Sequence, residues 1–368
     1  MMKTRSYVWI CVAALFSLAA CIREDMESHP QAKEVELTII IQGTTVDTRG
    51  TGNLPADDNN GEKKINRLAI AIFDGSGNVT TIQEFTPATG SSSYKLKCKA
   101  GTGYSGIVVV NAPENHFAGI TKKTDFEAKT VDLAQTSDNL VMSGAMKANS
   151  NETFELSSTG ENKLTVNVSR LVARVAINSI KTGFEASGPY KSATFTAKKI
   201  FLHNANTKST VNPASPTGSE PLSGQTDGTN TGLQEALNNV SITGTPHTTP
   251  YWFYTFQHSA TTPTKLVIYG SFDPDGTGSA EASDVYYPIV VNKFQTGTII
   301  KNGNDVINAA TSGKGDATIT PNNTYLISAI IKGKGVSSPD EDITPAALEL
   351  TVTVEGWALN ISQEVTFD

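Results

Sequence analysis

The chain is 368 residues long, enough for two domains with separate cores, and its formal net charge is −7. Its lysines are scattered without a basic stripe, so nucleic acid is not expected as a partner. Of the three cysteines, Cys11 and Cys21 lie near the start, which leaves Cys98 without a cysteine for an internal disulfide. We therefore expect stability to come from packing and β pairing.

Residues 1–21 have the order of a bacterial lipoprotein signal peptide. Lys3 and Arg5 precede an apolar run that is too short to span a bilayer, and this run ends in Leu-Ala-Ala-Cys at Cys21. The order matches the lipobox, in which the cysteine thiol is acylated and becomes the new N-terminus. We therefore expect Cys21 to be the lipidation site of an exported protein that acyl chains hold at a membrane. The alternative is an ordinary signal peptide with a chance cysteine.

Residues 22–49 are predicted to form a charged tether followed by a first β-strand. Residues 22–33 carry almost no core-forming side chains, whereas residues 35–46 alternate apolar and polar side chains. One face of this strand is predicted to carry Val35, Leu37, Ile39 and Ile41. Residues 50–64 are rich in glycine, asparagine and charge, which predicts an exposed, flexible loop.

Strands are predicted along nearly all of the remaining sequence, with turns of glycine, asparagine and serine between them. They cover residues 65–73, 79–85, 94–98, 105–110, 164–180, 194–203, 251–258, 265–272, 285–292, 324–332, 348–357 and 361–367. Helical periodicity is weak, with short candidates at 124–133 and 233–238. This pattern predicts an all-β fold of two transthyretin-like or Greek-key β-sandwich domains with few short helices.

The polar stretch 148–162 is the best candidate for a boundary between the domains. We therefore expect an N-terminal β-sandwich domain over residues 50–160 and a C-terminal one over residues 161–368. Residues 204–249, rich in serine, threonine, asparagine and glycine, are interpreted as a long surface loop of the second domain.

The sequence shows no clear pattern of a catalytic, metal or cofactor site. Residues 273–284 loosely imitate a calcium loop, but the usual glutamate at the twelfth position is absent and a hairpin connection explains them. Its five histidines lack metal-ligand spacing, and it has neither a Gly-x-Ser-x-Gly nucleophile motif nor a phosphate-binding glycine loop. The aromatic run 251–254 is interpreted mainly as core packing, because alternate side chains of a strand face opposite sides. A surface glycan-binding lipoprotein, with Trp252 or residues 204–249 contacting sugar, is the alternative function.

Part of the first strand recurs near the C-terminus. Glu36–Gly43 reads ELTIIIQG and Glu349–Gly356 reads ELTVTVEG, with apolar residues in the same period-two phase. Two strands of one pattern can present the same side chains to one groove, although many amphipathic strands look alike. Arg49, followed by Gly50 in the expected loop, has the surroundings of a trypsin-like cleavage site. A cut there would release the first strand and open an apolar groove.

Together these features resemble the fimbrillins, the subunits of the type V pili of Bacteroidia. The resemblance rests on the lipobox, the first strand, Arg49 and the two predicted sandwiches. Further motifs that carry it along the whole chain are Val110–Pro113, Met142–Gly144, Ser169–Val175, Asn323–Ile327 and Val352–Trp357.

The resemblance implies a structural pilus subunit that supports adhesion and is not an enzyme. It implies an outer-membrane lipoprotein precursor that an arginine-specific protease cuts between Arg49 and Gly50. Residues 348–368 of a neighbouring subunit would then fill the vacated groove by strand addition. The donor side chains would be Leu348, Leu350, Val352, Val354, Trp357, Ile361, Val365 and Phe367.

The same resemblance predicts the partners and the location of the mature protein. The expected partners are other pilin subunits, both copies of this chain and accessory subunits, together with a host surface or glycan ligand. The mature form is expected on a cell-surface fimbrium.

The lipobox gives a direct test of lipidation. Substitution Cys21→Ser removes the thiol that would be acylated, so the precursor should lose its association with membranes. Membrane sedimentation and labelling with radioactive palmitate measure this. Unchanged sedimentation and continued labelling of the variant would show that Cys21 is not the lipidation site.

Overall fold

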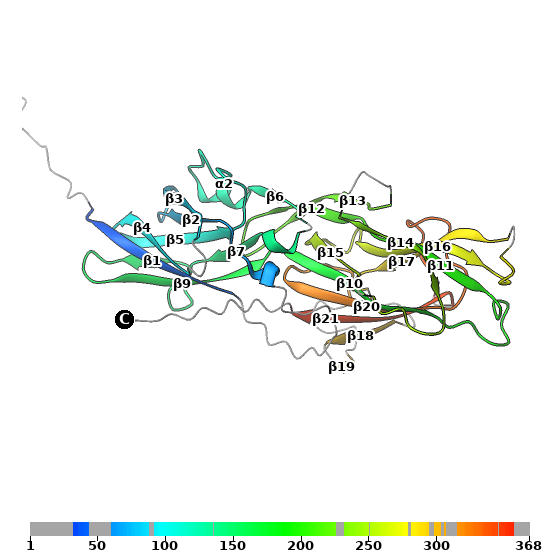
Figure 1. Ribbon diagram of the computed structural model, residues 1–368. Helices are drawn as coiled ribbons and strands as arrows, with labels where there is room; N and C mark the ends of the chain where they lie inside the picture. Colours follow the sequence, from blue (N-terminus) through cyan, green and yellow to red (C-terminus); the bar gives the residue numbers. More distant parts are fainter. Residues whose placement is uncertain are drawn as a thin grey trace, which may run out of the picture.

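Figure 1 shows the computed structural model as an elongated molecule in which two groups of strands follow one another. The structure describes residues 32–43, 60–87, 92–134, 136–225, 232–249, 251–278, 281–293, 298–302, 305–306, 315–344 and 346–356. The predicted all-β fold class is confirmed, whereas the Greek-key topology stays a prediction. Among the described residues, no helix is both long and apolar enough to cross a membrane.

The N-terminal sandwich is one sheet that folds over on itself. Its strands follow the order β3-β2-β5-β7-β9-β1-β4, and β8 pairs with β5. Inward side chains of β1 and β4 share a core with those of β2 and β5, so the two ends of the sheet face each other. The strands are β1 Glu34–Gly43, β2 Leu68–Phe73, β3 Val79–Phe85, β4 Ser93–Lys99, β5 Gly101–Val110, β7 Met142–Ala145, β8 Phe154–Leu156 and β9 Asn162–Arg170.

Two of the sequence motifs shape this sheet. Asn111 ends β5 with a φ of 60°, and its side-chain amide donates hydrogen bonds to the carbonyls of Lys64 and Leu140. Gly144 lets β7 pass close to β9, because a Cβ atom there would lie 2.3 Å from the backbone oxygen of Asn167. The close approach fixes the position of β9, the strand against which β1 packs.

The outer face of β2 and β5 is buried too, which explains why β2 is apolar at every position. Helix α2, Lys123–Glu127, and strand β6, Thr130–Asp132, contribute Phe126 and Val131 to the cover. Tyr254 of the C-terminal half belongs to the same cluster. The two halves of the molecule therefore share a core where they meet.

The C-terminal sandwich joins sheet β15-β10-β20-β21-β18-β19 to sheet β14-β11-β16-β17 through one core. A small sheet, β13-β12-β6, links the two halves of the molecule. The bounds are β10 Val172–Thr182, β11 Thr194–His203, β12 Ala205–Thr210, β13 Gly218–Leu222, β14 Gln234–Ile242, β15 Tyr251–Phe256, β16 Lys265–Asp273, β17 Ser283–Val290, β18 Thr298–Asn302, β19 Asp305–Val306, β20 Asn323–Ile331 and β21 Leu348–Gly356.

Residues 204–249 are not the surface loop that we expected. They contain β12, which pairs with β6, and β14, which pairs with β11. Few of their side chains are apolar, but Leu237 and Ile242 of β14 reach the core. The prediction of a helix at 233–238 is therefore wrong, because most of this segment belongs to β14. The helix predicted at 124–133 is shorter in the structure, where it is α2.

The domain boundary that we expected between residues 160 and 161 stays a prediction. The pairing of β9 and β10 shows where the chain leaves one sandwich and enters the other. Strand β9 begins at Asn162 but pairs with β1 and β7 of the N-terminal sandwich. Strand β10 begins at Val172 and pairs with β15 and β20. The chain therefore passes from one sandwich to the other at Leu171.

A buried ion pair at this junction holds the segment that follows the expected cleavage loop. Glu62 lies on the 3-10 helix η1, Asn60–Lys63, and is only 3% exposed. Its carboxylate is 3.3 Å from a guanidinium nitrogen of Arg174 and accepts a 2.7 Å hydrogen bond from the Tyr254 hydroxyl. The Arg170 side chain donates to the Glu62 carbonyl. The end of the expected exposed loop 50–64 is thus packed against both sandwiches.

This cluster predicts a large loss of stability in the variant Glu62→Gln. The substitution keeps the shape but leaves the buried Arg174 cation without its carboxylate, which should lower the free energy of unfolding by about 3 kcal/mol or more. The matched control is Glu114→Gln, which removes an exposed ion pair with Arg67 and should cost little. Urea unfolding measures both, and equal midpoints for the two variants would contradict this role of Glu62.

Candidate functional site

Strand β1 is a central strand that connects β4 to the rest of its sheet. It runs antiparallel to β4, with Leu37 opposite Leu96, and parallel to β9, with Leu37 opposite Asn162. Among the described strands, β4 pairs with β1 alone. Loss of β1 would leave backbone groups of both β4 and β9 without their hydrogen-bond partners, at a high cost in free energy.

The inward face of β1 is part of the core. Leu37 and Ile39 are fully buried and Ile41 is 2% exposed, while Val35 packs half-buried at the end of the row. This confirms the alternation predicted from the sequence, which arises because successive side chains of a strand point to opposite faces. Burial of each of the three fully packed side chains contributes roughly 1.5–3 kcal/mol. Their removal would open an apolar groove between β4 and β9.

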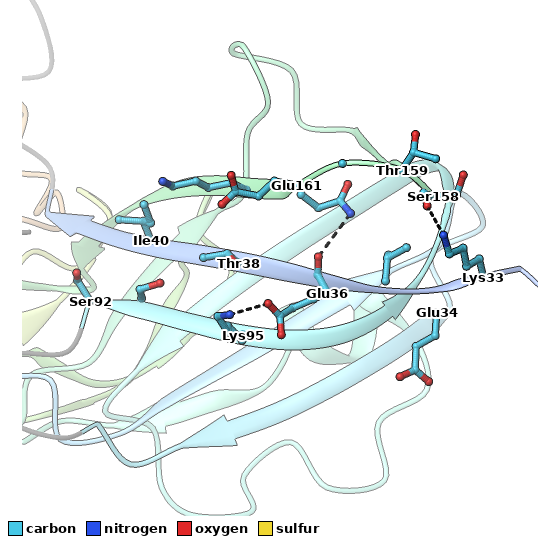
Figure 2. A pocket seen from close by; sticks show the side chains of 15 residues that line it. Lys33, Glu34, Glu36, Thr38, Ile40, Ser92, Lys95, Ser158, Thr159 and Glu161 are labelled. Atoms are coloured by element: carbon cyan, nitrogen blue, oxygen red, sulfur yellow. Dashed lines mark hydrogen bonds and ion pairs between the residues drawn. The ribbon is translucent and has the colours of Figure 1, made fainter. Parts of the chain in front are cut away.

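The outward face of β1 carries charge that β4 neutralises. Figure 2 shows Glu36 of β1 reaching Lys95, and the two side chains form an ion pair of 2.7 Å. Glu34 pairs with Lys97 at 3.1 Å. The hydrogen bond and the charge of Glu36 raise the pKa of Lys95. Strand β4 thus offers a row of lysines to whichever strand lies beside it.

A surface hollow of about 610 Å³ lies over this face, between β4 and the turn that precedes β9. In Figure 2 the Lys33 ammonium points to the Ser158 carbonyl, with a distance of 2.9 Å. The Asn162 side chain stabilises this turn through two hydrogen bonds to Ser157. Its amide oxygen accepts a hydrogen bond from the Ser157 backbone N–H, and its amide nitrogen donates one to the Ser157 carbonyl. The turn therefore fixes where β9 begins and how β1 lies against it.

Several predicted site residues lie outside the described residues. They are Cys21, Arg49, Gly50, Trp357, Ile361, Val365 and Phe367. Their roles in lipidation, cleavage and strand donation stay predictions. The described chain nevertheless places β1 on one side of Arg49 and helix η1 on the other.

The first half of the expected donor segment is built into its own sandwich. Strand β21 lies between β20, to which it is antiparallel, and β18, to which it is parallel. Leu348 and Leu350 are each 4% exposed and Val352 is fully buried. The strand also includes Val354. To act in another subunit, β21 would have to leave both neighbours and expose Leu348, Leu350 and Val352.

Sequence reasoning missed Glu62 and the lysines of β4. Glu62 stands in a polar, glycine-rich stretch, and only its distant partners Arg174 and Tyr254 show that it is buried. Lys95 and Lys97 had a visible signal, because they alternate along β4 as Glu34 and Glu36 alternate along β1. Opposite charges in matching period-two rows indicate strands that pair.

Trp252 is the predicted glycan contact, and 38% of its surface is exposed. The other large apolar residue that is similarly exposed among the described residues is Leu222. No other large aromatic side chain is among the exposed residues that the structure describes. The structure therefore adds no support to a glycan site at Trp252.

Comparison with known proteins agrees with this fold. The model of the family described as major fimbrial subunit protein (FimA) matches residues 34–231. A fimbrilin (FimA) structure from Porphyromonas gingivalis W83 is similar, with 21% identity, a TM-score of 0.63, and coverage of 90% of this chain and 99% of that one. A putative cell adhesion protein from Parabacteroides distasonis ATCC 8503 has 17% identity, a TM-score of 0.68, and coverages of 91% and 99%. Among curated protein sequences, none matches significantly.

The packing of β1 predicts that inward and outward substitutions differ in effect. Leu37→Ala should lower the free energy of unfolding of the precursor by about 2.7–5 kcal/mol, because it leaves a cavity in the core. Glu36→Gln, one residue away, breaks only an exposed ion pair and should change stability little. Urea unfolding of the two variants checks this. A Leu37→Ala variant as stable as Glu36→Gln would show that β1 is not part of the core.

Proposed function

The chain belongs to the major fimbrial subunit protein (FimA) family, and from this premise we propose that it polymerises by exchange of its first strand. It is a structural subunit of a cell-surface fimbrium that supports adhesion, and it assembles with other fimbrial subunits. The exchange consists of proteolytic removal of β1 and its replacement by a strand from the next subunit.

One observation carries the proposal: β1 is central to its sheet, yet it precedes every other described element of the chain. A single cut between β1 and η1 frees it without breaking any other strand that the structure describes. Arg49 lies in that interval and is the proposed site, with Gly50 following it. Arg170 and Arg174 are 1% and 5% exposed and lie in paired strands, which protects them from the same protease.

The chain after the cut stays attached through its buried contacts. Glu62, a short distance beyond Arg49 in sequence, is held by Arg174 and Tyr254. Burial lowers the pKa of Arg170 to about 10, so this second cation near Glu62 remains charged at neutral pH. These contacts support a cleaved subunit that keeps its junction while it loses β1.

The lipid anchor fits the same sequence of events. Cys21 precedes β1, so acyl chains on Cys21 hold the uncut precursor at the outer membrane. An arginine-specific protease that cuts after Arg49 separates the subunit from its anchor and opens the groove in one step. Release of the subunit from the membrane and opening of its groove for assembly are thereby coupled.

The proposed donor is the segment after β21. Strand β21 itself is held by β20 and β18, and its departure would expose buried side chains. Residues 361–367 alternate Ile361, Gln363, Val365 and Phe367 on one side. This segment can enter a neighbouring groove while β21 stays in place.

Substitution Arg49→Ala should stop assembly by leaving β1 in its sheet. The variant should remain a folded, uncut monomer, whereas the cut wild type forms ladders of SDS-resistant polymers on gels. Arg49→Lys is the matched control, since it should resist an arginine-specific protease but still be cut by trypsin. Polymers of Arg49→Ala with a normal mature N-terminus would show that cleavage occurs elsewhere.

Deletion of residues 361–368 should separate folding from assembly. The truncated chain keeps β1 to β21, so it should fold and be cut like the wild type but form no polymer. Gel ladders and electron microscopy of sheared surface material measure this. Fibres of normal length from the truncated protein would rule out this segment as the donor.

A further inference from the structure

A four-residue pattern occurs three times in the chain: glutamate, an apolar residue, threonine, and a second apolar residue other than proline. The copies are Glu36–Ile39, Glu349–Val352 and Glu364–Phe367. The first lies in β1 and the second in β21. The third follows β21 and lies outside the described residues.

The two described copies have the same burial pattern and the same kind of neighbouring strands. In each, the glutamate is exposed, the threonine is half-buried and both apolar side chains are buried. Each strand lies between an antiparallel neighbour and a parallel one, which are β4 and β9 for the first copy and β20 and β18 for the second. In both described copies the pattern therefore occurs in a strand that lies between an antiparallel and a parallel neighbour.

A lysine of the antiparallel neighbour meets the glutamate in both cases. Glu36 lies 2.7 Å from Lys95 of β4, and Glu349 lies 3.5 Å from Lys332, the residue that follows β20. When β1 leaves, Lys95 and Lys97 lose Glu36 and Glu34 together. The rim of the open groove then carries positive charge above an apolar floor, which selects an acidic amphipathic strand.

We propose that Glu364–Phe367 of a second copy of this chain fills the groove in the register of Glu36–Ile39, with Glu364 paired to Lys95. Val365 then takes the place of Leu37, and Phe367 takes the place of Ile39. The strand runs antiparallel to β4 and parallel to β9, as β1 does. This assignment rests on the proposed strand exchange and adds the direction of the donor strand, its register and the ion pair that fixes it.

The register is constrained in two ways. A shift by one residue would turn Val365 and Phe367 to solvent and bury Glu364, which is unfavourable. A shift by two residues in one direction would bury Gln363 in the place of Leu37, and a shift in the other direction would move Val365 to the half-buried place of Val35. In the proposed register, residues 362–368 cover the places of Glu34 to Ile40, the full pairing of β1 with β4.

Cys98 is a built-in reporter of this register. It lies on β4 directly opposite Val35, whose place Gln363 would take. Antiparallel partners have Cα atoms about 4.5–5.5 Å apart, within the range of about 4.4–6.8 Å that a disulfide spans. A Gln363→Cys variant should therefore form a disulfide with Cys98 of the neighbouring subunit.

The experiment compares cysteine substitutions at 361, 363, 365 and 367 in the full-length chain. After cleavage at Arg49, assembly proceeds with diamide at pH 9, because burial raises the pKa of the Cys98 thiol to about 11. Diamide takes up the two hydrogens as the disulfide forms, and non-reducing gels detect the product. Mixing a tagged Gln363→Cys, Cys98→Ala chain with an untagged wild-type chain shows whether the bond joins two subunits.

We expect a strong cross-link for residue 363 alone, between subunits, and none when both chains carry Cys98→Ala. A cross-link through 361 or 365 instead would overturn the register but keep the exchange. SDS-resistant polymers without a cross-link at any of the four positions would overturn the occupant. If the wild type forms no polymer after cleavage, the proposed function itself fails.

Charge reversal tests the pairing of Glu364 with Lys95. Lys95→Glu and Glu364→Lys should each slow polymer growth by about fivefold, and the double variant should regain most of the rate. Lys191→Glu, an exposed charge reversal between β10 and β11 of the C-terminal sandwich, is the matched control and should have little effect. Additive losses in the double variant would refute this ion pair.

Discussion

The structure of the N-terminal sandwich depends on the hydrogen bonds and apolar contacts that β1 supplies to β4 and β9. Strand β4 pairs with β1 alone among the described strands, and Leu37 and Ile39 fill the core beneath. A sheet cannot keep a gap at such a position, because unpaired backbone groups and exposed apolar side chains are both costly in water. The groove must therefore hold a strand, either its own or one from another chain.

In the proposed exchange, this constraint links proteolysis to assembly. A strand that comes first among the described elements and is central in its sheet can be released by one cut, and its loss creates a site that only a similar strand satisfies. The Glu62 cluster joins the segment after the proposed cut to both sandwiches, so these contacts do not depend on β1. In the proposed joint, backbone pairing supplies strength, and the lysines of β4 favour an acidic strand.

The sequence was informative where a local period determines the structure. The alternation of Val35, Leu37, Ile39 and Ile41 predicted β1 and its buried face, and the sparse helical periodicity predicted an all-β fold. The recurrence of the ELT pattern pointed to two similar strands, although it did not show that β21 is already paired within its own sandwich. Pairing partners are set by the tertiary structure, which a local pattern does not contain.

The remaining features depend on contacts between residues far apart in the sequence. Glu62 is buried only because Arg174 and Tyr254 converge on it from another sandwich. Strands β12 and β14 form in a polar stretch because β6 and β11 offer them free edges, which overrides their weak intrinsic preference. Likewise β9 joins the N-terminal sandwich through β1 and β7, beyond the polar stretch that suggested a boundary.

Hydrogen–deuterium exchange of the N-terminal sheet tests the central claim most directly. Three states are compared: the intact precursor, the subunit after cleavage and removal of β1, and that subunit with a synthetic peptide of residues 357–368. The account predicts that the amides of β4 and β9 are protected, then exchange rapidly, then regain protection, while β10 and β20 stay protected throughout. Protection of β4 and β9 that is unchanged by the loss of β1, or that the peptide does not restore, would contradict it.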